Sequence, residues 1–467
     1  MASSYITRTS AGTGNQKKGT WSAWIKKGND SYGVVAEESI FGHGADSSNL
    51  CSLIINSSGQ MELRNKASGS YTVRNKTNRQ FKDASAFYHI VVQYDTTQST
   101  EADRLKLFVN NEQITSWAST DWPTLNEDLK INTSGETSTL GRQVPSSGDY
   151  FRGTMSHVYW LDGVIAAPTV FGGYNATDGM WEINTNPTIS SYGTNGFCLK
   201  LENSSNLDQD TGTNGFTFTT SGELTASKDN PSNSFCTLNC QVYYGSGVST
   251  FNDAGTQFVG SQGNAWRIVA GTTLISKGKY YYEVKINTAS ANNSYSIGWM
   301  STDRFDPSNT MIGYIGDQYG PAFGLMKDGQ INYSTTTSDS QADTGWTSYT
   351  NGGDIICCAI DLDNLKAYYG LNGVWMKSGD PTSGSTGTGA FSISNAGYNW
   401  IPAFGSSETA SGSTCHMSAN FGQGFFGNVS GAPTAVASAG TNASGNGTFE
   451  FDVPTGYTAL CTKGINS

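Results

Sequence analysis

Alternating apolar and polar residues predict an antiparallel pair of strands near the middle of the chain. Tyr282 and Val284 share one face of the first strand, whereas Glu283 and Lys285 share the other. This period of two is typical of a strand with one buried face. After an Asn-rich turn, residues 295–299 repeat the pattern. We therefore expect the apolar face of this pair to line a core and the other face to be solvated.

The same alternation continues towards the C-terminus and divides the chain into many short strands. Residues 354–376 predict two strands joined by an Asp-rich turn and followed by a hairpin turn at Asn372 and Gly373. Two further strands are predicted in 400–405 and 417–426, and a last one in 448–453.

The N-terminal half contains the same order of strands and turns. Residues 88–109 predict a strand, an Asp-bearing turn and a returning strand, and Asn110 and Asn111 supply the next turn. This order repeats that of residues 355–373, although the flanking segments do not repeat. Two sandwiches with a similar layout, rather than an array of sequence repeats, explain this similarity between the two halves.

The length of the chain and one polar segment set the predicted domain organisation. A chain of 467 residues is too long for one core. We predict a β-sandwich over 1–225, a linker over 226–244 and a second sandwich over 245–467, because residues 220–234 are polar and contain proline. The predicted fold class is therefore all-β, with two antiparallel, jelly-roll-like sandwiches in tandem.

The amino-acid composition supports the all-β prediction, and the net charge limits the classes of expected binding partner. Charged residues make up only 14% of the chain, against about 25% in ordinary globular proteins. The 56 glycines and the aromatic content of 12% suit strands and tight turns. A net charge of −11 without a basic run excludes nucleic acid from the expected partners. No apolar stretch predicts membrane insertion, and the N-terminus lacks a secretory signal, so synthesis in a cytoplasm is expected.

The sequence contains no convincing catalytic or metal-binding motif. The eight cysteines and four histidines are scattered, which favours free, buried thiols and predicts no metal site and no cofactor. Glu450 and Asp452 alone approach the paired acids of a glycosidase, and a strand with a polar solvated face explains them better. His89 is expected as a hydrogen-bonded edge residue rather than a base. No catalytic residue is predicted, and the chain is expected not to be an enzyme.

Three aspartates could in principle hold a hard cation. Asp361 and Asp363 lie in one turn, and Asp46 lies in a polar loop that could belong to a calcium site. Aspartate is also a common turn-forming residue, which is the alternative that we favour for the pair.

Aromatic residues in glycine-rich loops are the candidate contacts for a glycan or a protein partner. A sugar ring stacks on an aromatic side chain while amides and carboxylates bind its hydroxyl groups. The candidates are Tyr314, Asp317, Tyr319, Trp346, Tyr349 and Tyr398. Packing in the core or in an assembly is the alternative explanation for the same residues.

Three resemblances to known families follow from segments of this chain. GKYYYEV, SIGWM, AYYGLNG, PAFG and NFG occur in the order typical of SPRY domains, which the second half therefore resembles. WSAWIKKG, YHIVVQYD, LKLFVNNEQ and FRGTMSHVYWLDG resemble the laminin-G-like, concanavalin-type lectin sandwich. SYITRT, DNPSNSFCTLN and FEFDVPTGYTALCTKGI are similar to segments of structural proteins of marine tailed phages.

The phage resemblance implies a non-enzymatic virion protein, either a capsid decoration or a tail fibre or appendage. It would be made in the host cytoplasm and displayed on the particle exterior as a homo-oligomer. Its expected partners are other virion proteins and a host-surface glycan. A concanavalin-type glycoside hydrolase and a SPRY-type adaptor that binds proteins remain the alternatives, because a fold alone does not define a function.

Overall fold

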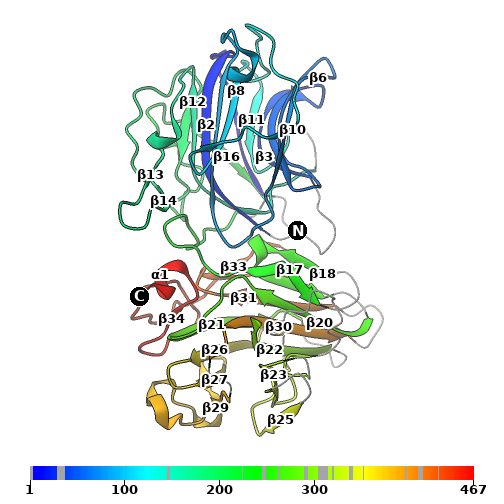
Figure 1. Cartoon of the computed structure of the whole chain (residues 1–467), viewed down its shortest axis with the longest axis vertical. Helices are drawn as coiled ribbons and strands as arrows, with labels where there is room; N and C mark the ends of the chain where they lie inside the picture. Colours follow the sequence, from blue (N-terminus) through cyan, green and yellow to red (C-terminus); the bar gives the residue numbers. More distant parts are fainter. Residues whose placement is uncertain are drawn as a thin grey trace.

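The structure is a computed structural model. It describes residues 4–28, 37–144, 148–222, 224–244, 249–260, 263–288, 293–302, 314–317, 320–335, 340–350, 352–394, 397–408, 414–429 and 431–466. Strands dominate this part of the chain, and they form two β-sandwiches stacked end to end (Figure 1). The predicted fold class is confirmed.

The first sandwich packs an eight-stranded sheet against a six-stranded one. The larger sheet has the order β10 (Trp117–Ser119), β6 (Ser70–Gln80), β5 (Gln60–Ala67), β4 (Asn49–Ile55), β3 (Glu38–Asp46), β11 (Thr137–Leu140), β1 (Tyr5–Thr9) and β16 (Thr219–Ser221). The smaller sheet has the order β15 (Phe197–Leu199), β12 (Gly153–Asp162), β2 (Lys18–Lys27), β7 (Tyr88–Asp95), β8 (Leu105–Val109) and β9 (Glu112–Gln113). Alternate residues such as Trp21, Ala23 and Ile25 of β2 enter the core between the sheets.

Short elements complete this half. The hairpin of β13 (Gly172–Tyr174) and β14 (Trp181–Ile183) and the 3-10 turns η1 (Glu101–Asp103) and η2 (Pro168–Val170) lie in its connections.

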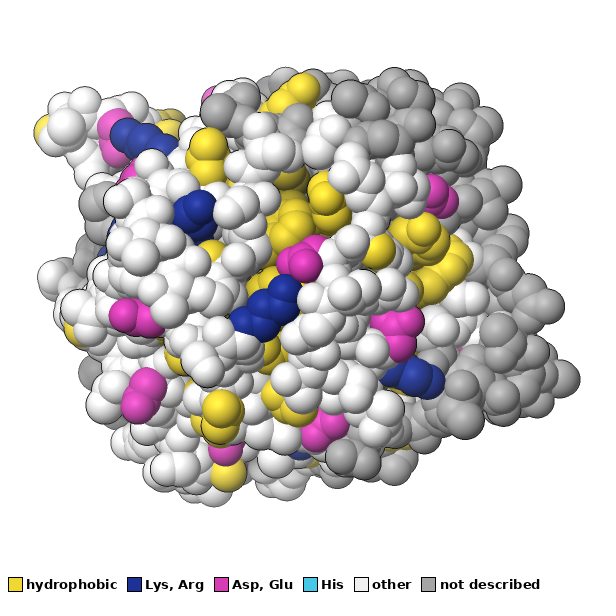
Figure 2. All heavy atoms as spheres, turned by 90° about the horizontal axis from the view of Figure 1, so that it is seen from below, with side chains coloured by type: hydrophobic (Ala, Val, Ile, Leu, Met, Phe, Trp, Pro, Cys, Tyr) yellow, Lys and Arg dark blue, Asp and Glu magenta, His cyan; other side chains and the backbone are white. Residues whose placement is uncertain are grey.

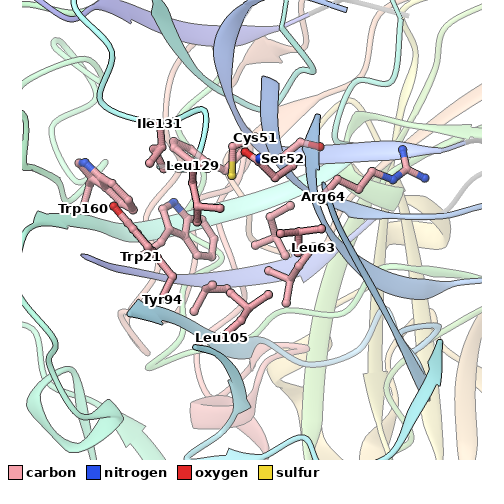
Figure 3. A pocket seen from close by; sticks show the side chains of 15 residues that line it. Trp21, Cys51, Ser52, Leu63, Arg64, Tyr94, Leu105, Leu129, Ile131 and Trp160 are labelled. Carbon is pink, nitrogen blue, oxygen red and sulfur yellow. The ribbon is translucent and has the colours of Figure 1, made fainter. Parts of the chain in front are cut away.

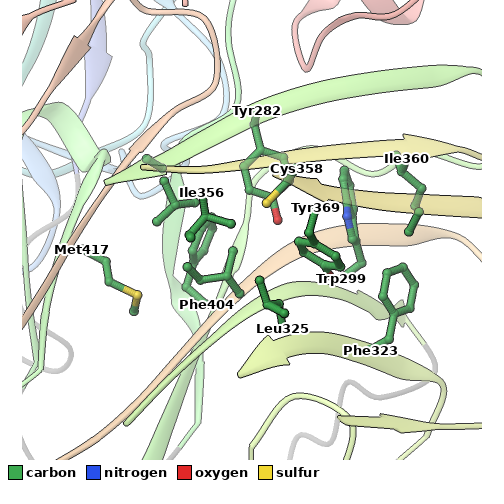
Figure 4. Close-up of a cluster of buried hydrophobic side chains, with 14 of the residues drawn as sticks. Tyr282, Trp299, Phe323, Leu325, Ile356, Cys358, Ile360, Tyr369, Phe404 and Met417 are labelled. Carbon is green, nitrogen blue, oxygen red and sulfur yellow. The ribbon is translucent and has the colours of Figure 1, made fainter. Parts of the chain in front are cut away.

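The second sandwich is built in the same way. One sheet has the order β17 (Leu238–Tyr244), β20 (Gly263–Gly271), β30 (Trp400–Glu408), β22 (Asn293–Ser301), β23 (Ala322–Met326), β24 (Gln330–Ser334) and β25 (Gln341–Thr344). The other has β18 (Ser249–Asn252), β19 (Gln257–Gly260), β31 (Cys415–Asn420), β21 (Lys279–Ile286), β26 (Ile355–Asp361), β27 (Lys366–Leu371) and β28 (Val374–Trp375). β29 (Phe391–Ser392) pairs with β27, and β34 (Thr458–Ala459) pairs with β21. Tyr282, Trp299 and Phe404 meet in the core between these sheets (Figure 4).

The remaining elements of this half are short. They are the pair β32 (Phe425–Phe426) and β33 (Thr434–Ala435), the 3-10 turns η3 (Asp253–Gly255), η5 (Met376–Ser378) and η6 (Pro381–Thr386), and the helix α1 (Thr462–Ile465).

The outer face of β21 differs from the sequence-based prediction. We expected Glu283 to be solvated, but its side chain is fully buried. The C-terminal segment lies over this face and buries Phe449, Val453 and Tyr457 against the sheet. The predicted strand 448–453 is likewise wrong, because this segment runs as irregular chain and donates two backbone N–H groups to the Glu283 carboxylate, at 2.9 and 2.8 Å.

The connecting segment docks onto both sandwiches. Lys26 of β2 and Asp229 form an ion pair of 2.8 Å, and both side chains are buried. Lys26 also donates to the backbone carbonyl of Phe235, at 2.6 Å. Because an unpaired charge at this depth would be costly, the pair fixes the connector against the first sandwich.

All eight cysteines are free thiols, and all except Cys51 are buried. The prediction of free thiols is therefore confirmed. Burial raises the pKa of the Cys357 thiol to about 12, which keeps it protonated and unreactive.

Candidate functional site

The predicted aromatic contacts do not form one platform. Trp346 and Tyr349 lie in the interior of the second sandwich, with exposed fractions of only 6% and 1%. The Tyr349 hydroxyl donates to the backbone carbonyl of Leu325 at 3.1 Å, as a buried phenol requires. For these two residues the alternative of core packing holds.

Two other candidates lie elsewhere on this sandwich. The Tyr314 ring packs edge-on against Trp266, with centroids 5.7 Å apart, and its hydroxyl lies 3.2 Å from the Ser340 hydroxyl. Asp317 follows in the same loop and is partly exposed. Tyr319 lies outside the described residues. A glycan contact at Tyr314 and Asp317 stays a prediction.

Tyr398 is the last member of a row of aromatic side chains in the second sandwich. The row lies at the end of the sandwich where β25 and β29 are found. In this row Tyr333 packs on Phe391 at 5.2 Å, Phe391 on Phe323 at 5.1 Å, Phe323 on Trp400 at 5.2 Å and Trp400 on Tyr398 at 6.5 Å. The inner members are buried, whereas Tyr333 and Tyr398 are partly exposed. We call this set the aromatic row.

Tyr333 and Phe391 were missed by the sequence analysis. Tyr333 reads as an ordinary strand residue, and Phe391 follows a loop of Ser, Thr and Gly. Tyr333 shares its face of β24 with the buried Ile331, so the alternation carries no signal that Tyr333 reaches the surface. Only the pairing of β29 with β27 brings Phe391 beside Tyr333.

A charged cluster lies over Trp346 beside the row. The Trp346 indole N–H donates to the Asp343 carboxylate at 3.0 Å, and the Lys377 ammonium lies 4.4 Å from the ring centroid. Lys377 also pairs with Asp343 at 3.2 Å. Lys377 and Ser378 both have left-handed backbones, with φ of 53° and 51°, which non-glycine residues adopt at some cost.

Figure 2 shows this end of the molecule from below. Hydrophobic side chains gather near the centre of the view, with basic and acidic side chains beside them. The arrangement places aromatic surface next to charged groups that can form hydrogen bonds.

The acids considered for catalysis are engaged in structural hydrogen bonds. Glu450 accepts from the backbone N–H of Ala437 at 2.7 Å, and Asp452 accepts from the N–H of Thr441 at 2.7 Å. These bonds lower the pKa of Asp452, which is exposed.

The candidate cation ligands are turn residues in this structure. Asp361 pairs with Lys279 at 2.9 Å and accepts from the Asn364 side chain, and Asp363 accepts from the backbone N–H of Gly278. Asp46 accepts from the backbone N–H groups of residues 48 and 49, which lowers its pKa. Over the described ranges, no group of three His, Cys, Asp or Glu side chains could hold a metal ion.

His89 is interior rather than at an edge, since β7 lies between β2 and β8. Its ring stacks on Trp24 with centroids 4.8 Å apart and contacts Ser22 at 2.9 Å. Its other nitrogen accepts from the Trp181 indole at 3.1 Å. Both ring nitrogens are therefore satisfied, and burial lowers the pKa of His89 to about 3.

The first sandwich contains a small internal cavity of about 50 Å³ (Figure 3). Its lining is almost wholly apolar and includes Trp21, Leu63, Leu105 and Trp160. A void of this size and character is too small and too apolar for a sugar ring, so it is a packing feature of the core.

These folds and surfaces define the chain as a protein of paired antiparallel β-sandwiches. Residues 1–171 match the family model described as the concanavalin A-like lectin/glucanases superfamily. The laminin-G-like, concanavalin-type resemblance of the first sandwich is thereby confirmed. No curated protein matches the chain.

SPRY domains and a pentraxin are among the similar solved structures. The SPRY domain of human HERC1 has 14% identity and a TM-score of 0.26, and covers 36% of this chain and 89% of its own. The TRIM65 PSpry domain has 12% identity and a TM-score of 0.26, and covers 37% and 82%. A heptameric SAP-like pentraxin from Limulus polyphemus has 11% identity and a TM-score of 0.28, and covers 39% and 85%. TM-scores this low do not define a shared fold, so the fold assignment rests on the sheets themselves.

In the described ranges, no helix has the length and apolar character needed to cross a membrane.

Proposed function

We propose that this chain is a non-enzymatic binding protein of a tailed-phage virion, displayed on the particle as a capsid decoration or tail appendage. Its sandwiches present surfaces to a host-surface glycan, and contacts with other virion proteins anchor it as a homo-oligomer. The phage context comes from the sequence resemblance of residues 4–9, 229–239 and 449–465, and the binding role comes from the fold and the surface.

One observation carries the binding role. The first sandwich matches a lectin and glucanase superfamily, whereas the acids nearest to a glucanase pattern, Glu450 and Asp452, lie on the second sandwich and accept hydrogen bonds from backbone N–H groups. At the far end of the second sandwich, the aromatic row brings Tyr333 and Tyr398 to the surface. This combination supports recognition without bond cleavage.

The proposal is tested by binding of labelled protein to intact bacterial host cells, together with a search for the chain in purified particles. We expect saturable cell binding and incorporation into the particle. Failure of both would overturn the proposal. Incorporation without cell binding would restrict the chain to a structural role in the virion.

The aromatic row can be tested in the same assay. Replacing both Tyr333 and Tyr398 by Ala is expected to weaken cell binding by about tenfold if sugar rings stack on them, with little loss of folding because both are partly exposed. Tyr71→Ala is the control, since Tyr71 is an exposed tyrosine on the other sandwich. Release of reducing sugar from host polysaccharide would instead indicate the glycoside hydrolase alternative.

A further inference from the structure

A cleft of about 1050 Å³ lies between the two sandwiches, outside the aromatic row. Its lining comes from β1 and the start of β12, from the connector at 224–232, and from η3 and residues 423–425 of the second sandwich. This volume lies just above the range of about 300–1,000 Å³ for small-molecule sites. It is large enough for several sugar rings.

The walls of the cleft are held in place by interactions that span the domains. The buried ion pair of Lys26 and Asp229 ties the connector to the first sandwich. On the other side, the backbone N–H of Lys228 donates to the carbonyl of Gln423 in the second sandwich, at 3.0 Å. The cleft is therefore preformed, so a ligand would not have to order its walls.

One wall presents aromatic rings. Tyr5 and Tyr150 lie with their centroids 6.1 Å apart, and Phe151 follows in sequence; all three are partly exposed and line the cleft. The Arg142 guanidinium lies 4.5 Å from the Tyr5 centroid and so fixes that ring by a cation–π contact. Aromatic side chains with one polar end suit ligands that have both apolar faces and hydroxyl groups.

A polar group lies on the same wall. His157 contacts the Ser156 hydroxyl at 2.7 Å through one ring nitrogen and the Glu202 carboxylate at 3.1 Å through the other. His157 sits at a register shift in β12 with φ of 51°, a conformation that a bulge imposes and that turns its side chain. The exposed Glu202 is thus held beside the cleft, where its oxygens can accept hydrogen bonds from hydroxyl groups.

The charges around the cleft balance. Arg152 and Lys228 lie among its lining residues, and so do Glu202 and Asp253. Asp229 is neutralised by Lys26. A site without a net charge gives no preference for an acidic or a basic ligand, whereas its aromatic and hydroxyl-binding groups favour a neutral one.

The geometry points to this cleft as a binding site for a neutral oligosaccharide segment of several sugar units. The inference rests on the proposed binding function and adds to the aromatic row a second site at the junction of the two sandwiches. Stacking on Tyr5, Tyr150 and Phe151 supplies affinity, and Glu202 orients the hydroxyl groups.

The test uses the full chain and an array of neutral and uronic-acid oligosaccharides of two to six sugar units. We expect neutral oligosaccharides to bind, and Tyr150→Ala to weaken this binding by about tenfold. Ser232→Trp, which places a bulky side chain at an exposed position of the lining, is expected to abolish it. Tyr174→Ala is the control, because Tyr174 is exposed but lies outside the cleft. Thermal unfolding of each variant shows whether it is folded.

The outcomes separate this inference from the broader proposal. Oligosaccharide binding that a folded Ser232→Trp variant leaves intact overturns the cleft as the site but not the binding function. Binding of uronic-acid oligosaccharides only, or of peptides in place of sugars, overturns the ligand class. Loss of binding in the folded Ser232→Trp variant with an intact Tyr174→Ala control supports the inference, even if Tyr150→Ala proves unstable.

Discussion

One three-stranded unit in each sandwich is built on the same plan, and the two units differ in what covers them. In β2, β7 and β8, Lys18 opens the first strand opposite Asp95, which ends the second, and the two pair at 3.4 Å. In β21, β26 and β27, Lys279 opens the first strand opposite Asp361, and they pair at 2.9 Å. In both, the aspartate also accepts hydrogen bonds within its own turn.

The segments that cover the two units are held by different kinds of interaction. Over β7 the β13–β14 hairpin places Trp181 on His89, so the outer face is closed by stacked rings and one indole hydrogen bond. Over β21 the C-terminal segment is held by a buried carboxylate, because Glu283 accepts from the backbone N–H groups of Glu450 and Phe451. An aromatic cover tolerates small shifts, whereas a carboxylate that serves two backbone donors fixes one register.

The largest effect is expected from removing that carboxylate. Glu283→Ala leaves two backbone N–H groups and the Tyr281 hydroxyl without their acceptor in a buried place. At about 1–3 kcal/mol for each unsatisfied group, the free energy of unfolding should fall by roughly 3 kcal/mol or more. Urea unfolding measures the loss, and limited proteolysis should find the C-terminal segment cleaved first.

Glu283→Gln is the matched variant, since it keeps the shape and one acceptor oxygen, so it should lose less than Glu283→Ala. Trp181→Ala sharpens the comparison, because it should expose only the β13–β14 hairpin to protease. Equal resistance of the C-terminal segment in Glu283→Ala and the unsubstituted protein would show that its apolar contacts alone hold it.

The two covers should also respond to pH with opposite signs. Burial lowers the pKa of His89 from 6.5 to about 3, so the unfolded chain takes up a proton that the folded one refuses, and stability falls as pH drops from 6.5 towards 3. Burial raises the pKa of Glu283 from 4.5 to about 7 despite its hydrogen bonds. The folded chain then holds a proton that the unfolded one releases, so this stabilisation is lost as pH rises from 4.5 to 7.

Urea unfolding at several pH values measures both slopes. His89→Phe should reduce the acid-side loss, to which the buried His43 also contributes, and Glu283→Gln should reduce the loss between pH 4.5 and 7. Unchanged slopes in the two variants would place the titrating groups elsewhere.

The same comparison shows which features the sequence predicts and which it does not. Many of the strands, the turns at Asn110 and Asn372 and the all-β class were visible, because period-two alternation and turn residues are local signals. The cover of β21 was not visible, because Glu283 receives its donors from residues 167 and 168 positions away. A charged residue on a strand predicts a solvated face unless such a partner is known.

The candidate site shows the same limit. Aromatic residues in glycine-rich loops were predicted to be exposed, yet Trp346 lies under Lys377 and Tyr349 is in the core. Exposure depends on which loops meet at the end of the sandwich, and that is set by pairings such as β29 with β27. The cleft is less predictable still, since its walls come from both sandwiches and the connector.

The smallest effects are expected where the two units are most alike. Asn110 and Asn372 both have φ of 50°. The side-chain oxygen of each accepts from a backbone N–H of the second strand of its unit, that of His89 and that of Ile355, at 2.8 Å in both cases. Replacing either by Ala removes the acceptor and puts in the left-handed region a residue that tolerates it less well than asparagine, at a combined cost of about 1–2 kcal/mol. Replacing either by Gly should cost less, because glycine adopts this backbone freely and only the acceptor is lost. Urea unfolding of the four variants should therefore give matching pairs of losses in the free energy of unfolding.

A much larger loss for Asn372→Ala than for Asn110→Ala would mean that the second turn also supports its neighbour Asp354, to which the Asn372 amide donates at 3.1 Å.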